Sequence, residues 1–219
     1  NALRLREIEK AKAEELNHAK LQFFTNITHE LLTPLTIISA TVDELKTQAP
    51  SHNDLYTVMN SNIQRLIRLL QQILEFRKAE TGNLKLCVSP GDIADFVKRE
   101  TESFQPLVKK RKIHFSVLCD PEAIIGYFDT DKLDKILYNL LSNAAKYNKE
   151  GGFIQVTLSY DKNKDFVLLK VKDNGKGISK EKQKMLFKRF YEGDYRKFNT
   201  IGTGIGLSLT KDLVELHGG

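Results

Sequence analysis

The chain is organised around one stretch, FFTNITHELLTPL at residues 23–35. Apolar residues in and after it recur at spacings of three and four or their multiples, which predicts an amphipathic helix; they are Phe24, Ile27, Leu31, Ile38 and Leu45. If Phe24 opens a heptad, His29 falls at position f, opposite the apolar seam. An imidazole there adds little to packing, but it is mostly neutral at pH 7, with an ordinary pKa of about 6.5, and can act as a nucleophile. A lone histidine is more often an ordinary surface residue, so its neighbours must decide.

Composition bounds the class of protein. A chain of 219 residues with 41% hydrophobic content can form one or two globular domains. The net charge of +6 is evenly spread, which suits a polyanionic ligand such as a nucleotide but does not indicate nucleic acid. Cys87 and Cys119 alone predict neither a disulfide framework nor a zinc site. No run of 18 apolar residues occurs, so no membrane contact is expected in this region.

A hairpin of two long helices is predicted for the first part of the chain. Residues 1–22 are charged and helix-prone but too poor in apolar residues to bury themselves, so we expect a coiled coil with a second copy. The helix continues to about Lys46, a turn surrounds Pro50, and a second amphipathic helix spans about Ser51 to Ala79. Because the hairpin has little core of its own, dimerisation into a four-helix bundle would bury both seams.

Pro34 and Gly82 are expected to interrupt or end the helices of this hairpin. Pro34 removes a backbone hydrogen bond, so it should kink or loosen the turn after His29. Gly82 is expected to cap the second helix and act as a hinge. The expected domains are therefore residues 1–22, 23–83 and 84–219.

From Leu84 onward the pattern changes to strands mixed with helices. Strands are expected at about 84–88, 113–117, 123–128, 153–160 and 166–171, and helices at about 92–109, 131–146, 180–187 and 205–217. A hairpin turn is predicted at residues 161–164. These elements predict an α+β sandwich, with one mixed sheet that carries helices on one face.

A polar stripe on the predicted helix 131–146 is the first candidate binding element. Asn139, Asn143 and Lys146 are spaced by four and three, so they share a helix face opposite several leucines. An amide oxygen is a hard ligand for Mg²⁺ and an ammonium attracts phosphate, so the stripe suits a phosphate chain with a divalent cation. A solvated helix face could carry the same residues by chance.

Two glycine-rich segments are further candidates. Asp173 ends a strand before Gly175 and Gly177, and its carboxylate could accept a hydrogen bond from an amine such as that of adenine, although Asp-Asn-Gly is also an ordinary turn. The loop IGTGIGLSL at 201–209 opens a helix whose N-terminal N–H groups could bind phosphate. It has neither the lysine of a P-loop nor a preceding strand of a βαβ unit. Residues 185–200, rich in Lys, Arg, Tyr and Gly, resemble a mobile lid.

The order of these segments resembles that of two-component sensor histidine kinases. HELLTP at 29–34 is similar to their H box, and the helix with Asn139 and Asn143 is similar to their N box. DNGKG at 173–177, FKRF at 187–190 and GTGIG at 202–206 resemble the first G, F and second G boxes. The sequence FFTNITHE at residues 23–30 is also similar to that of hybrid kinases of gut Bacteroides. The resemblance covers nearly the whole chain and implies a Bergerat-type ATP-binding fold, shared with gyrase and Hsp90, joined to a dimeric histidine-bearing hairpin.

The resemblance implies catalytic roles for four residues. His29 would be the phosphoacceptor, and Glu30 the carboxylate that takes the imidazole proton. Thr33 would orient water for dephosphorylation of the partner regulator. Arg189 would neutralise charge on the transferring γ-phosphoryl group, as such transfers require.

The remaining matched residues are implied to form the site for ATP and Mg²⁺. Asn143 would hold the Mg²⁺ ion, Tyr147 would pack near the adenine, and Asp173 would read its amine. The residues implied to contact or wrap the phosphates and line the site are Asn139, Lys146, Gly175, Gly177, Gly202, Thr203, Gly204, Gly206 and Leu207.

The chain departs from the family pattern in two places. Leu32 stands where many members carry Arg, next to the acceptor position. The sequence ends at Gly219, where the family continues into the last strands of the ATP-binding sheet, so we expect that sheet to be incomplete at its C-terminal end.

The implied function is ATP-dependent autophosphorylation of His29, followed by transfer to an aspartate of a response-regulator receiver domain, separate or fused, with phosphatase activity as well. The expected location is the cytoplasmic part of a bacterial inner-membrane sensor. Two alternatives stay open: a non-catalytic dimeric signalling scaffold, and a plain Bergerat-fold ATPase.

Overall fold

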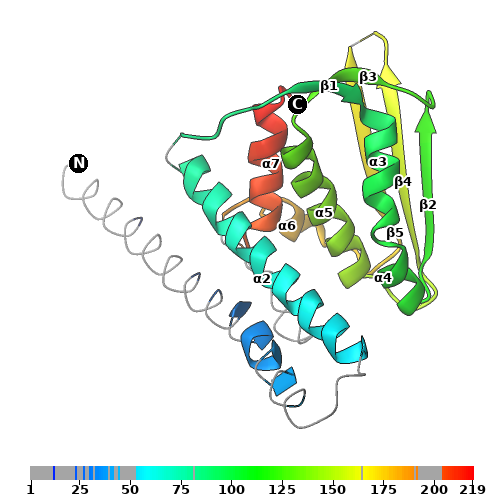
Figure 1. The fold of residues 1–219 in the computed structure, drawn as a ribbon. Coiled ribbons are helices and arrows are strands. Elements are labelled where there is room, and N and C mark those ends of the chain that lie inside the picture. Colours follow the sequence, from blue (N-terminus) through cyan, green and yellow to red (C-terminus); the bar gives the residue numbers. More distant parts are fainter. Residues whose placement is uncertain are drawn as a thin grey trace, which may run out of the picture. The chain divides into compact units, whose positions relative to one another are not determined.

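The computed structural model describes residues 12, 23, 27, 30, 31, 33–38, 40, 41, 44, 53–80, 82–163, 165–189, 191 and 204–219. By the contacts between residues, the chain divides into two compact units. The first unit comprises residues 1–82 and 188–209, and the second comprises residues 83–187 and 210–219. Figure 1 shows their secondary structure.

A helical hairpin forms the first unit's framework. The described residues between 23 and 44 are helical, and α2 spans Asn53–Glu80. The rings of Phe23 and Phe76 lie 5.8 Å apart between centroids, and Glu30 Oε2 lies 3.7 Å from Arg65 Nη2. Since residue numbers rise on one helix as they fall on the other, the two helices are antiparallel, as predicted.

Gly82 ends α2 in the predicted way. Its φ angle is +67°, a left-handed conformation that favours glycine, and its N–H donates to the Ala79 carbonyl over 3.3 Å. Pro34 is buried, and residues 33–38 are all helical; the expected kink at Pro34 stays a prediction.

Within the single chain, the first helix buries part of the predicted face, including Ile27. Leu31 and Ile38, which were expected in the seam, are only half-buried. Among the described residues of this helix, the buried ones are Phe23, Ile27, Glu30, Pro34 and Thr41. Other large apolar side chains of the hairpin are exposed, namely Leu35, Ile37, Val58, Ile63, Ile67 and Leu70. The hairpin therefore has two apolar faces, which the sequence periodicity alone does not separate.

The second unit is an α+β sandwich. Its three-stranded sheet has the order β2-β4-β5, formed by His114–Asp120, Phe153–Asp161 and Phe166–Asp173. Strand β2 is parallel to β4, and β4 is antiparallel to β5. Strands β1 (Ser89–Asp92) and β3 (Ile125–Phe128) form a separate antiparallel pair. The helices after the hairpin are α3 (Ile93–Glu102), α4 (Gln105–Lys110), α5 (Thr130–Lys146), α6 (Lys180–Gln183) and α7 (Gly206–Leu216). The first four belong to the second unit, and α7 begins in the first unit and ends in the second.

Helices α3 and α5 cover one face of the three-stranded sheet (Figure 1). Ile154, Val156 and Leu158 alternate along β4 and point into the core, because successive strand residues face opposite sides. Leu137 and Leu141 of α5 belong to the same buried cluster. Burial of the apolar face of α5 turns its opposite face away from the sheet.

The structure corrects four expected elements. Residues 83–88 form no strand, and the N–H of Cys87 donates instead to Asp129 Oδ2 over 2.8 Å. The expected helix 92–109 is two helices, because Phe104 breaks the first and enters the core. The expected helix 180–187 stops at Gln183. The expected single sheet is two sheets, because Ser89–Asp92 pairs only with β3.

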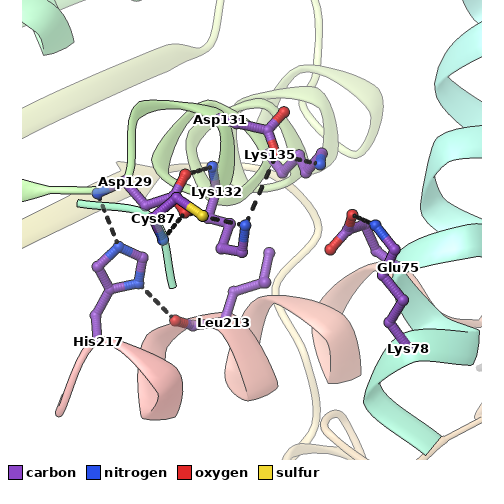
Figure 2. Close-up of polar contacts among 9 residues, drawn as sticks. All are labelled: Glu75, Lys78, Cys87, Asp129, Asp131, Lys132, Lys135, Leu213 and His217. Carbon is purple, nitrogen blue, oxygen red and sulfur yellow. Dashed lines mark hydrogen bonds and ion pairs between the residues drawn. The ribbon is translucent and has the colours of Figure 1, made fainter. Parts of the chain in front are cut away.

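A buried carboxylate holds the start of α5 (Figure 2). Asp129 is only 2% exposed; its Oδ1 accepts from the N–H of Lys132 over 3.1 Å, and its Oδ2 lies 3.0 Å from Lys132 Nζ. The N–H of Asp129 donates to His217 Nε2 over 3.4 Å. Burial raises the pKa of Asp129, but the hydrogen bonds from Cys87 and Lys132 outweigh it and hold the pKa below its ordinary value of 3.8.

Replacement of Asp129 by Asn should destabilise the second unit by about 3 kcal/mol at pH 7, because it removes the closer of the two carboxylates beside the buried Lys132 ammonium and leaves only Asp131, at 4.0 Å. The measurement is the free energy of unfolding in urea. The matched control is Asp131→Asn on the same helical turn, whose carboxylate is 63% exposed, and its cost should be under about 1 kcal/mol.

The same pair of proteins tests the pKa of Asp129. Because the pKa is lowered by folding, the carboxylate stabilises the fold above pH 3.8, and this stabilisation is lost as the pH falls below that value. The difference in free energy of unfolding between the wild type and Asp129→Asn should therefore decrease as the pH falls below 3.8. An advantage that is constant down to pH 2.5 would contradict the assignment.

Candidate functional site

The polar stripe of α5 divides into a buried and an accessible part. Asn139 is 5% exposed, and its Nδ2 donates to Thr210 Oγ1 over 3.2 Å. This bond ties α5 to a residue 71 positions away, so Asn139 has a structural partner. Its predicted contact with phosphate stays a prediction.

Asn143 and Lys146 lie on the half-buried part of the stripe. The side-chain amide of Asn143 has no hydrogen-bond partner among the residues that the structure describes, which leaves its oxygen available to a ligand. Lys146 Nζ lies 5.2 Å from the centroid of the Tyr147 ring, a cation–π distance. An amide oxygen and an ammonium are thus presented together at the C-terminal end of α5.

The donor set fits a magnesium ion that is shared with a phosphate chain. Within the described part of the chain, no cluster of three His, Cys, Asp or Glu residues could enclose a metal. Mg²⁺ commonly takes one or two protein ligands and completes its shell with phosphate oxygens and water. The available oxygen of Asn143 could supply one such ligand.

The end of β5 meets the end of α5. A Cβ atom on Gly175 would lie 2.5 Å from the carbonyl oxygen of Tyr147, so only glycine fits there. The N–H of Lys176 donates to the same oxygen over 3.2 Å. The structure therefore joins two predicted motifs that lie about 30 residues apart in the sequence, the polar helix with Tyr147 and the turn after Asp173.

Asp173 is exposed at this junction. Its Oδ1 accepts from the N–H of Gly175 over 2.8 Å, which orients the carboxylate and leaves Oδ2 for a ligand. Gly177 has a φ angle of +68°, so the turn needs glycine at this position too. A carboxylate held in this way can accept a hydrogen bond from an amine of a ligand.

Other predicted site residues belong to the first unit. Glu30 lies in the seam between the helices, 6% exposed, whereas Thr33 is exposed. The guanidinium of Arg189 lies over the Phe76 ring at 5.4 Å. Gly204 has a φ angle of +65°, and α7 begins at Gly206, followed by a half-buried Leu207. His29, Gly202 and Thr203 lie outside the described residues.

The sequence analysis did not identify Arg111, whose guanidinium binds the C-terminal end of α5. Its Nη1 donates to the carbonyl of Ala145 and, over 3.3 Å, to that of Lys146. A guanidinium there satisfies carbonyls at the C-terminal end of α5 and complements the helix dipole. Arg111 lies in the run KKRK at 109–112, which has the appearance of an ordinary solvated charge cluster, so the sequence carries no signal for this role.

Membrane-spanning helices are absent from the described part of the chain, where no helix combines sufficient length with sufficient hydrophobicity.

Two family models match the chain. Residues 19–82 match the His Kinase A (phospho-acceptor) domain, and residues 128–219 match the histidine kinase-, DNA gyrase B-, and HSP90-like ATPase. The matches fall on the helical hairpin and on the sandwich with α5, β4 and β5, and together they cover most of the sequence.

Relatives and solved structures agree with this pair of domains. The chain is 36% identical over 224 residues to histidine kinase P4 of Formosa agariphila; the match covers 99% of the chain but 16% of that relative. Full-length ShkA in complex with AMPPNP has a TM-score of 0.64 at 22% identity, covering 90% of this chain and 41% of that one. Histidine kinase ThkA in complex with the response regulator protein TrrA has a TM-score of 0.50 at 21% identity, covering 85% and 55%.

The two structural likenesses show a shared fold, and the family models add the types of domain and their order. A phosphoacceptor hairpin followed by an ATPase domain of this type defines one family. The chain belongs to the sensor histidine kinases of two-component systems.

Proposed function

We propose that this chain is the catalytic core of an ATP-dependent protein-histidine kinase, which phosphorylates itself on His29 and passes the phosphoryl group to an aspartate of a response regulator. One observation carries the proposal: Gly175 and Lys176 pack on the Tyr147 carbonyl. This contact unites a carboxylate suited to an adenine amine with a helix end that presents an amide oxygen and an ammonium.

The second unit would bind the nucleotide. Asp173 Oδ2 accepts a hydrogen bond from the adenine amine, and Lys146 supplies positive charge to the phosphates. Asn143 supplies an oxygen ligand to Mg²⁺, and the ion, when bound, neutralises charge on the phosphate oxygens. Tyr147 packs near the adenine.

The first unit would supply the acceptor. A ring nitrogen of neutral His29 attacks the γ-phosphorus, the bond from that phosphorus to its bridging oxygen breaks, and ADP leaves. The second ring nitrogen gives its proton to Glu30. Neighbouring residues project about 100° apart on a helix, so burial of Glu30 in the seam is compatible with an acceptor outside the seam. Arg189 stabilises charge on the transferring group.

A homodimer would complete the hairpin. The exposed apolar residues Leu35, Ile37, Ile63, Ile67 and Leu70 lie on its two helices, and a second hairpin would cover them in a four-helix bundle. Residues 1–22 would transmit the signal into the phosphotransfer domain, 23–83, and the catalytic domain would comprise 84–219. The complex of ThkA with a response regulator supports a partner of that class. Thr33 is exposed, as a residue that orients water during dephosphorylation must be.

With Mg-ATP, the protein should gain a phosphate that is labile in acid and stable in base, and His29→Ala should abolish it. A phosphoramidate on a histidine nitrogen has this lability, whereas serine and threonine esters do not. Radiolabel retained after alkali and lost in acid is the measurement. His114→Ala, at an exposed histidine of β2, is the control and should keep full labelling. Label that persists in His29→Ala would refute the acceptor.

Asn143→Ala should weaken binding of Mg-ADP about tenfold or more, because it removes a metal ligand. Calorimetry with Mg²⁺ and with EDTA separates this role from a structural one, since the difference between variant and wild type should vanish in EDTA. Asn163→Ala, on the exposed turn between β4 and β5, should bind as the wild type does. Equal affinity of Asn143→Ala and the wild type in Mg²⁺ would exclude the metal role.

A further inference from the structure

Two asparagine side chains grip one residue at the start of β4. Asn174 Oδ1 accepts from the N–H of Phe153 over 2.7 Å. Asn148 Nδ2 donates to the carbonyl of Phe153 over 3.0 Å. We call Asn148, Phe153 and Asn174, with the intervening Gly152, the amide clasp. Asn148 directly follows Tyr147, and Asn174 directly follows Asp173, so the clasp lies between the two motifs of the nucleotide site.

The clasp begins where the backbone pairing of β4 with β5 ends. The last partners at this end of the ladder are Ile154 and Asp173. One step further, the side chain of Asn174 provides the acceptor for the Phe153 N–H, so this partly buried donor stays satisfied. The main chain after Asn174 is then available to turn toward Tyr147, where Gly175 and Lys176 meet the carbonyl.

The orientation of the Asn148 amide follows from its two bonds. Its Oδ1 accepts from the N–H of Lys149 over 2.9 Å, so the nitrogen must be the atom that faces the Phe153 carbonyl. Gly152 closes the arrangement: a Cβ atom there would overlap Asn148 Oδ1 and lie 2.8 Å from Asn174 Oδ1. Only a glycine allows both asparagines to reach the strand.

We propose that Asn148 and Asn174 are positioning residues that set adenine specificity, by holding Tyr147 and Asp173 in one register through Phe153. The proposal rests on the proposed nucleotide-binding function and adds the residues that place its two recognition groups. Both asparagines would act through the main chain of Phe153 rather than by contact with the nucleotide. A carboxylate displaced by about 1 Å would lose its hydrogen bond to the amine, so loss of the clasp should lower discrimination between adenine and guanine.

The two positions have opposite chemical requirements. Asn174 acts as an acceptor, so Asn174→Asp retains the bond to Phe153, whereas the similarly sized Asn174→Leu loses it. Asn148 acts as a donor, so Asn148→Asp places a carboxylate oxygen against a carbonyl oxygen. The same substitution, Asn to Asp, is therefore expected to be tolerated at 174 and harmful at 148.

The experiment measures dissociation constants of Mg-ADP and Mg-GDP by calorimetry with the full chain, together with the melting temperature. The wild type should prefer ADP. Asn148→Asp and Asn174→Leu should lower the ratio of GDP to ADP dissociation constants about tenfold, while Asn174→Asp should keep it within about threefold. Asn163→Asp, which adds the same charge on the exposed β4–β5 turn, is the matched control and should keep the ratio.

This ratio separates positioning from folding. A purely structural role would lower the melting temperature and the fraction of competent sites but leave the ratio unchanged, because both ligands sample the same folded molecules. A wild-type ratio in folded Asn148→Asp, or equal losses in Asn174→Asp and Asn174→Leu, would overturn the proposal. If Asn148→Asp does not fold, Asn148→Ala removes the donor without adding charge, and the same decrease is required of it. A wild type that binds neither nucleotide would refute the proposed function itself.

Discussion

Burial of the apolar face of α5 against the sheet is the constraint on which the candidate site depends. Leu137, Leu141, Ala144 and Ala145 pack with β4 in a single cluster, so the opposite face of the helix cannot turn inward. That face carries Asn143 and Lys146. Hydrophobic packing is not directional by itself, but on a helix of 3.6 residues per turn it decides where every polar side chain points. Asp129 at the start of α5 and Arg111 at its end then hold the helix along its length.

Polar contacts at the C-terminal end of α5 fix the position of the loop after α5 relative to the turn after β5. The Tyr147 carbonyl receives the N–H of Lys176, and the amide clasp satisfies both backbone groups of Phe153. Each contact links the loop after α5 to the turn after β5. Backbone groups of loops can usually form their hydrogen bonds with water. Because these groups bind protein atoms instead, we infer that the position of one motif relative to the other is important for the site.

The hairpin shows how far periodicity reaches. The pattern of residues 23–45 predicts a helix, and the described residues of that stretch are helical. The antiparallel hairpin is confirmed by the Phe23–Phe76 and Glu30–Arg65 contacts. Within the single chain the predicted seam is only partly buried, since Ile27 is buried while Leu31 and Ile38 are half-buried. Glu30 takes a buried position that polarity would assign to solvent. Strand β1 was also displaced: Ser89–Asp92 has weak strand propensity and forms a strand only because β3 lies beside it.

The sequence by itself determined the helical hairpin, the α+β class of the second unit, the cap at Gly82 and the polar stripe of α5. Each of these depends on the type and spacing of residues that are close together in the sequence. The resemblance, carried by motifs in a fixed order, identified the family, and the two family models confirm it. Only the tertiary structure decided that Asn139 is buried against Thr210, that Arg111 braces α5, and that Asn148 and Asn174 meet at Phe153. These contacts join residues whose separation in sequence has no period, so only the packed chain brings them together.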